Sequence, residues 1–326
     1  MKRLILFIMC TSLLISCTGQ SANEQQPVNS KPIVYMTKDI SPEALVRIYE
    51  ALGRPAEGRV AVKISTGEAG GHNYLKPELI GLLVNKVNGT IVECNTAYHG
   101  KRNTFEAHWQ TIRDHGFLDI AKVDLMDEEG DMQIPVQDST WIHYDIVGKH
   151  LSNYDFMINL AHFKGHAMGG FGGVLKNQSI GVASAAGKAY IHSAGTTDDV
   201  HECWNHTDNQ DGFLESMAAA AQAVHNYFGN GERILYINVA NNLSVDCDCD
   251  SHPADPEMND IGILASLDPV ALDQACVDLV FHYPSQKGDD AAALIERINS
   301  RHGIHILEQA AKIGLGSRDY QLVNIE

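Results

Sequence analysis

The chain concentrates its chemically reactive side chains in one segment, residues 159–193. After a short apolar run come basic side chains, then glycines, then a lysine and an asparagine: His162, Lys164, His166, Gly169, Gly170, Gly172, Gly173, Lys176 and Asn177. Histidine and lysine supply bases, metal ligands and anchors for anions, and glycines let a bound group approach the backbone. We therefore expect His166, Lys176 and Lys164 to be catalytic, His162 to bind a metal ion, and the glycines with Asn177 to bind a cofactor.

A purely structural turn would explain the glycines of this segment. It would not explain the three basic side chains that directly precede them. Polar loops at the carboxyl ends of strands are where α/β proteins bind ligands, which favours a functional site here. The order of glycine and lysine differs from G-x-x-x-x-G-K-[ST], so the segment is not a P-loop.

A second reactive group is the pair Cys247 and Cys249 in the sequence VDCDCD, with His252 just beyond it. Two thiols with neighbouring acids could bind a soft metal ion. Alternatively, the pair is an inert surface feature, or it forms a disulfide that cycles with the dithiol, although cysteines this close in sequence do not bridge easily. The spacing leaves all of these possibilities open.

Strand and helix patterns alternate along most of the chain. Alternating or apolar runs predict strands over residues 59–65, 90–93, 155–160, 233–239 and 320–325. Helical periodicity with capping residues predicts helices over residues 77–87, 103–115, 211–228, 289–301 and 304–313, and another that starts at Pro269. This order predicts an α/β fold: a mainly parallel sheet with helices on both faces, built as one domain or as two lobes around a pocket that meet near residues 195–211.

The first residues have the pattern of an exported bacterial lipoprotein. Lys2 and Arg3 precede a short apolar run, and Leu14-Ile15-Ser16-Cys17 has the form of a lipobox. We expect residues 1–16 to be a cleaved signal peptide, Cys17 to carry the lipid, and residues 17–31 to be a flexible tether before a folded region over residues 32–326. The protein would then be anchored in the cell envelope, at the outer membrane and facing the periplasm.

The net charge limits the partners of the protein. The chain has a formal charge of −17, and loss of Lys2 and Arg3 with the signal peptide would give −17 − 2 = −19. So acidic a protein is a poor partner for nucleic acid or for anionic lipid headgroups. The charge is compatible with cations or neutral small molecules as ligands, and the lipid on Cys17 would provide the contact with the membrane.

The chain resembles the family catalogued as domain of unknown function 362, over nearly all of residues 33–325. The matching pieces are VKISTGEAGGHNYLKPELI, NTAYHGKRNTFEAHWQTIRDHGF, HFKGHAMGGFGGVLKNQSIGVASAAGKAYIHS, YINVANNLSVDCDCD and DIGILASLDPVALDQACVDLV, in that order. Many relatives carry a ferredoxin-like insert with two iron–sulfur cluster motifs shortly after the position of His192. Here that place holds AGTTDDVHECWNHTDNQDG with a single cysteine, so the resemblance implies no iron–sulfur cluster in this chain.

A more distant likeness connects the same segment with the nickel-pincer lactate racemases. That family has a histidine, a Gly-Gly loop, a lysine that holds a pyridinium cofactor covalently, and a later histidine on nickel. His166, the GGFGG loop, Lys176 and His192 follow in this order, and His99 matches an upstream catalytic histidine. The likeness implies that His192 binds metal and that His99 takes part in catalysis.

These observations support three hypotheses. The first is an exported enzyme that uses a divalent metal (nickel, iron or zinc) on a small anionic or carboxylated substrate. The second is a non-catalytic lipoprotein that binds a metal ion or a small ligand in the same pocket. The third is a thiol redox protein that uses Cys247 and Cys249.

Overall fold

The computed structural model describes residues 31–326, which form one compact unit. The expected signal peptide, the lipidated Cys17 and nearly all of the expected tether lie outside the described residues. Within residues 31–326, no helix combines the length and the apolar character needed to cross a membrane.

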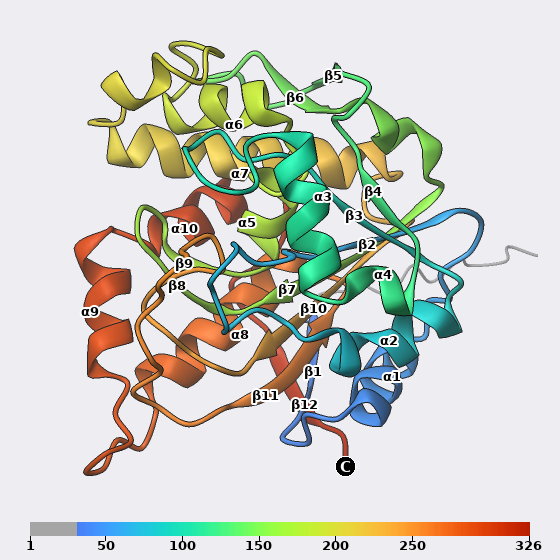
Figure 1. The fold of residues 1–326 in the computed structure, drawn as a ribbon. Coiled ribbons are helices and arrows are strands. Elements are labelled where there is room, and N and C mark those ends of the chain that lie inside the picture. Colours follow the sequence, from blue (N-terminus) through green and yellow to red (C-terminus); the bar gives the residue numbers. More distant parts are fainter. Residues whose placement is uncertain (1–30) are drawn as a thin grey trace, which may run out of the picture. The chain divides into compact units, whose positions relative to one another are not determined.

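One eight-stranded sheet forms the centre of the fold, in the strand order β12-β1-β11-β10-β7-β2-β3-β4 (Figure 1). Its strands are β1 (Ile33–Thr37), β2 (Val60–Lys63), β3 (Thr90–Glu93), β4 (Val123–Leu125), β7 (Phe156–His162), β10 (Ile234–Ala240), β11 (Gly262–Ser266) and β12 (Gln321–Asn324). All neighbours pair in parallel except β11, which is antiparallel to both β1 and β10. The predicted mainly parallel α/β fold is therefore confirmed.

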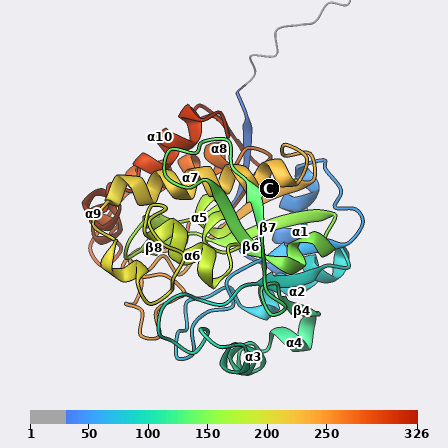
Figure 2. The same ribbon diagram turned by 90° about the horizontal axis from the view of Figure 1, so that it is seen from above.

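Helices cover both faces of this sheet, and two short ribbons extend from it (Figures 1 and 2). The helices are α1 (Pro42–Ala51), α2 (Pro77–Lys86), α3 (Phe105–Asp114), α4 (Phe117–Ile120), α5 (Val174–Ser179), α6 (Ala185–His192), α7 (Gln210–Tyr227), α8 (Pro269–Phe281), α9 (Ala292–Ser300) and α10 (His305–Lys312). The ribbons pair β5 (Asp131–Pro135) with β6 (Tyr144–Gly148) and β8 (Lys164–His166) with β9 (Gly170–Gly172). Short 3-10 turns span Lys149–Asn153 and Cys203–Asn205.

The central strand β7 shows how the sheet separates two apolar cores. Phe156, Ile158 and Leu160 belong to the core that includes residues of α1 and α2, whereas Met157 and Ala161 belong to the core that includes residues of α5, α7 and α8. This alternation is the period of two expected for a strand buried on both faces. The strand ends at His162, so the basic segment starts where the sheet stops.

Buried polar groups on β7 and α8 hold the start of helix α5. Asn159 on β7 donates to the Val174 carbonyl (2.9 Å), and Asp273 on α8 accepts from the Val174 and Leu175 N–H groups (both 2.9 Å). Gly173 is required beside this carboxylate, because a Cβ there would lie 2.3 Å from the Asp273 Oδ1. Asp273 therefore caps the start of α5, the helix that carries Lys176.

Several elements were not expected from the sequence. Strand β11 runs against its neighbours, and α5 and α6 form within the segment interpreted as a glycine loop. Both helices are short and largely buried, so they lack the two-sided periodicity by which a surface helix is recognised. Strand β1 and helix α1 were missed as well, although Ser41 and Pro42 are ordinary helix-start residues.

Candidate functional site

The central cavity of the protein lies at the carboxyl ends of β2, β3 and β7. It has a volume of about 260 Å³ and is lined by Lys63, Glu93 and His162 from these strand ends, together with residues of the segments that follow them. Adjacent strands of a parallel sheet end at the same edge, which explains why residues distant in sequence meet here. A wider, shallower pocket of about 690 Å³ shares Tyr98, Ala167 and Cys249 with the cavity.

The cavity is rich in positive charge. Five cationic side chains line it: Lys63, Arg102, Lys164, Lys176 and Lys188. The two carboxylates in its wall, Glu93 and Asp248, already form ion pairs within the protein. The cationic lining contrasts with the net charge of −17 for the whole chain.

A buried ion cluster centred on Asp248 joins the cysteine loop to the end of β7. The Asp248 Oδ1 is 2.7 Å from the His162 Nδ1, and its Oδ2 accepts from the Lys164 Nζ at 2.7 Å. Burial by itself would raise the pKa of Asp248, but the positive charges of His162 and Lys164 outweigh it and hold the pKa well below the usual range. The carboxylate therefore stays ionised.

His162 and Lys164 both form hydrogen bonds within the protein, and those of His162 leave no room for the metal-ligand role predicted for it. The second ring nitrogen of His162 donates to the Asn241 carbonyl (2.6 Å), so both of its nitrogens face acceptors and neither has a lone pair for a metal ion. Lys164 donates to Asp248 and to the His162 carbonyl (2.9 Å). These bonds tie β8 to the loop of Cys247 and Cys249, and the catalytic role of Lys164 stays a prediction.

Cys247 and Cys249 form a disulfide in the structure, on either side of Asp248. Of the alternatives that the spacing leaves open, the structure has the disulfide. Ligand atoms of both cysteines and of His166 lie within 4.8 Å of one another, a grouping compatible with a metal ion if the disulfide is reduced. His192, predicted as a metal ligand, does not belong to this group.

The hydrogen bonds of His166 and His192 place the ring hydrogen on a different nitrogen in each histidine. The Nδ1 of His166 accepts from the Gly169 N–H (2.8 Å), so the neutral ring carries its hydrogen on Nε2. The Nδ1 of His192 donates to the Lys188 carbonyl (2.6 Å), so its Nε2 has a free lone pair. His166 is therefore a donor toward the cavity and His192 is an acceptor.

Both histidines remain neutral over the physiological pH range. Burial, followed by the positive charge of Lys176, lowers the pKa of His166 well below its ordinary value. Burial also lowers the pKa of His192 to about 4. Neutral rings keep the donor and acceptor roles that their hydrogen bonds define.

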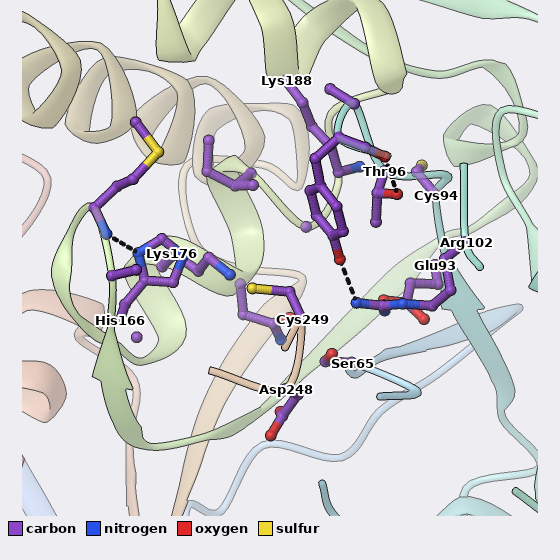
Figure 3. Close-up of a pocket in the computed structure, with 18 of the residues that line it drawn as sticks. Ser65, Glu93, Cys94, Thr96, Arg102, His166, Lys176, Lys188, Asp248 and Cys249 are labelled. Atoms are coloured by element: carbon purple, nitrogen blue, oxygen red, sulfur yellow. Dashed lines mark hydrogen bonds and ion pairs between the residues drawn. The ribbon is translucent and has the colours of Figure 1, made fainter. Parts of the chain in front are cut away.

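Lys176 is the basic side chain with the greatest freedom to act on a ligand. Among residues 31–326, no hydrogen-bond partner is found for its Nζ, and Figure 3 shows the side chain extending from α5 past His166 toward Cys249. Burial, reinforced by Lys164, lowers the pKa of Lys176 to about 7. The amine therefore exists in both protonation states near neutral pH.

The predicted cofactor-binding residues mostly serve the fold. Gly169 and Gly170 pack on the turn at Gly303, where a Cβ on Gly170 would lie 2.9 Å from the Gly303 Cα. The Asn177 amide donates to the Lys63 carbonyl (2.9 Å) and to the Asn159 Oδ1 (2.7 Å). Of the four glycines, only Gly172 lines the cavity, and the N–H groups that follow Gly173 are occupied by Asp273.

His99 lies outside the central cavity. It is exposed and lines the wider outer pocket, with its ring centroid 6.4 Å from that of His201. The predicted catalytic role of His99 would therefore require a ligand that reaches into the outer pocket. The structure brings together His166, Lys176 and His192 and leaves His99 apart from them.

Sequence reasoning missed several residues of the cavity wall. Lys63 ends a buried strand, and burial lowers its pKa to about 8. Arg102 is buried and donates to Glu93 (2.8 Å) and to the Tyr98 hydroxyl (3.0 Å), as Figure 3 shows in part. The sequence signal for Lys63 was a lysine inside an apolar strand, since lysine is rarely buried unless its charge is paired.

Comparison with known proteins identifies one family. The family model described as domain of unknown function (DUF362) matches residues 60–278. No curated protein matches the chain in sequence.

Two solved structures show limited similarity. The lactate racemase apoprotein from Thermoanaerobacterium thermosaccharolyticum aligns at 17% identity and a TM-score of 0.39, over 64% of this chain and 51% of that one. A structural-genomics protein from Thermotoga maritima aligns at 10% identity and a TM-score of 0.42, over 83% of this chain and 58% of that one. The chain thus spans little more than half the length of either protein. Similarity at this level is not evidence that the proteins catalyse the same reaction.

We predict that Asp248→Ala destabilises the protein by roughly 3–5 kcal/mol, because it leaves the buried charges of His162 and Lys164 without their counter-ion. Urea denaturation followed by circular dichroism measures the change. Asp250→Ala is the matched control, since Asp250 is exposed and, within residues 31–326, its carboxylate accepts only from the nearby His252 N–H. Equal stability of the two variants would show that the Asp248 cluster does not hold the loop.

Proposed function

This chain belongs to the DUF362 family, and we propose that its cavity is the active site of a metal-dependent enzyme that acts on a small carboxylated or otherwise anionic substrate. The observation that carries the proposal is the charge of the cavity: five cationic side chains and two carboxylates, both carboxylates already paired. Burying so much positive charge is unfavourable unless a bound anion compensates it.

Three side chains of the cavity, Lys176, His166 and His192, can bind such a substrate and accept a proton from it. Lys176 offers an ammonium group, and His166 offers an Nε2–H, to the substrate's carboxylate. His192 presents a lone pair that can accept a proton from the substrate. The cavity volume of about 260 Å³ suits a compact acid rather than a nucleotide or a peptide.

Cys247 and Cys249 are the residues that would hold the metal ion, after reduction of their disulfide. Thiolates favour zinc, nickel or iron over magnesium or calcium. His166 could join them only by giving up its Nε2 hydrogen or its hydrogen bond from Gly169. A metal ion at this position would supply Lewis-acid polarisation of a substrate oxygen.

The disulfide favours a second candidate function, a thiol redox protein. Cys249 is partly exposed and lines both pockets, so a soluble thiol can reach it from the outer one. In that case Cys247 and Cys249 would exchange electrons with a partner dithiol, and no resident metal would be needed.

We propose the location of the protein from its sequence alone. Cleavage of residues 1–16 and lipidation of Cys17 would place the domain at the cell envelope, on the periplasmic side of the outer membrane. An oxidising compartment is compatible with the disulfide of Cys247 and Cys249, so the metal site would require these two thiols to be kept reduced there.

The first test is the binding of small carboxylates, such as oxalate, pyruvate and lactate, by calorimetry between pH 6.5 and 8.5. We expect affinity to fall as the pH rises, because Lys176 (pKa about 7) and then Lys63 (pKa about 8) lose their charges. Lys176→Met should weaken binding roughly 10- to 100-fold at pH 6.5, since it removes a charged hydrogen bond. Lys176→Arg should keep the affinity up to higher pH.

The exposed Lys287 provides the control, and Lys287→Met should bind carboxylates as the wild type does. Unchanged affinity in Lys176→Met, or affinity that rises with pH, would contradict the anion site.

The second test separates the metal enzyme from the redox protein. Elemental analysis of the reduced full-length protein should find about one nickel, iron or zinc ion per chain more than in the Cys247→Ser/Cys249→Ser double variant. Cys203→Ser, which removes a buried free thiol elsewhere, should keep it. A metal content that does not depend on Cys247 and Cys249 would overturn the metal assignment and favour the redox function.

A further inference from the structure

The turn between α5 and α6 lies beside a second pair of lysines in the cavity wall. Lys63, at the end of β2, lies against Gly181, where a Cβ would be 2.8 Å from the Lys63 Nζ. Lys188, on α6, donates to the Ala183 carbonyl at 2.6 Å. Both lysines are buried and line the cavity, and Figure 3 shows Lys188 on the other side of the view from His166. The cavity therefore has a second pair of ammonium groups, away from the end formed by His166.

Both ammonium groups have N–H donors that the protein does not use. The Lys63 Nζ donates to the Ile64 carbonyl and to the Asn177 Oδ1 (3.2 Å). In the described part of the chain, the Lys188 Nζ donates only to the Ala183 carbonyl. An ammonium group has three N–H donors, so one on Lys63 and two on Lys188 have no acceptor there. Buried donors are nearly always hydrogen-bonded, which indicates that a ligand in the cavity supplies the missing acceptors.

The acids whose charges act on this pair of lysines are Glu93, Asp127 and Asp145, and none of them is a direct partner. Glu93 forms its ion pair with Arg102 (2.8 Å). Both oxygens of Asp127 accept from one backbone N–H, at 3.0 and 3.1 Å. Burial raises the pKa of Asp145 to about 8, so its carboxyl group is largely uncharged at neutral pH. Among residues 31–326, no acid forms an ion pair with either lysine.

We rest the next step on the proposed function, in which Lys176 and His166 hold one carboxylate of the substrate. We propose that Lys63 and Lys188 form a second anion-binding site in the same cavity, and that the substrate is therefore a dicarboxylic acid. The unused N–H donors of the two lysines would bind the oxygens of the second carboxylate. Charged hydrogen bonds of this kind are stronger than neutral ones, so the second carboxylate adds affinity.

A carboxylate fits this second site better than a phosphate group does. Phosphate sites in α/β proteins usually use free backbone N–H groups at the start of a helix. Asp273 accepts from those N–H groups at α5, and at α6 the Ser184 hydroxyl accepts from the Gly187 N–H (3.2 Å). The cavity volume of about 260 Å³ accommodates a short carbon chain between two carboxylates. The expected substrate class is therefore a short dicarboxylic acid.

Calorimetry on the full-length protein at pH 6.5 tests this with acids of matched chain length: succinate against butyrate, glutarate against pentanoate, and adipate against hexanoate. At this pH Lys63 (pKa about 8) is charged. We expect at least one dicarboxylate to bind roughly 10-fold or more tightly than its matched monocarboxylate. Equal affinities within all three pairs would overturn the second site alone. If neither kind of acid binds, the anion cavity of the proposed function is overturned as well.

Lys188→Met assigns the preference to this site. It should reduce the ratio of dicarboxylate to monocarboxylate affinity roughly 10-fold, because it removes the charge that only the second carboxylate contacts. Lys149→Met, which removes an exposed lysine elsewhere, should keep the ratio of the wild type. Circular dichroism checks the fold of both variants, and the comparison of matched acids in the wild type needs no substitution. A ratio that is unchanged in folded Lys188→Met would overturn the proposal.

Discussion

The buried carboxylate of Asp248 is the interaction on which the rest of the site depends. It pairs with His162 at the end of β7 and with Lys164 on β8, and so ties the loop of Cys247 and Cys249 to the edge of the sheet. An ion cluster this deep is stable only when every charge has a partner. Asp248 pairs with His162 and Lys164, but within residues 31–326 no acidic side chain pairs with Lys176.

A second set of buried polar groups determines where Lys176 lies. Glycine loops in α/β proteins often bind anions at a helix N-terminus, but here Asp273 already occupies the N–H groups at the start of α5. Asn177 is likewise held by the backbone of β2 and the side chain of Asn159. The N–H groups that follow Gly173 and the Asn177 amide are thus engaged within the protein. The glycine segment builds a short helix and directs Lys176 from that helix into the cavity.

The sequence predicted the alternating architecture and the segment that carries the chemistry, because periodicity and residue type are local properties. It predicted individual roles less well. His166 and Lys176 do meet in the cavity. In contrast, His99 lies in the outer pocket, and His162 is engaged in an ion pair with Asp248. The difference depends on hydrogen-bond partners up to 86 residues away in the chain, as for His162 and Asp248. No local pattern encodes such a partner, and the protonated nitrogen of each histidine follows from it.

The central claim is that the cavity binds a small acid between Lys176 and His166. A crystal structure of the reduced protein soaked with oxalate tests this most directly. The account predicts one carboxylate within hydrogen-bond distance of the Lys176 Nζ and the His166 Nε2, with His192 facing the bound acid. Oxalate bound only in the outer pocket beside His99, or an empty cavity at saturating oxalate, would contradict it.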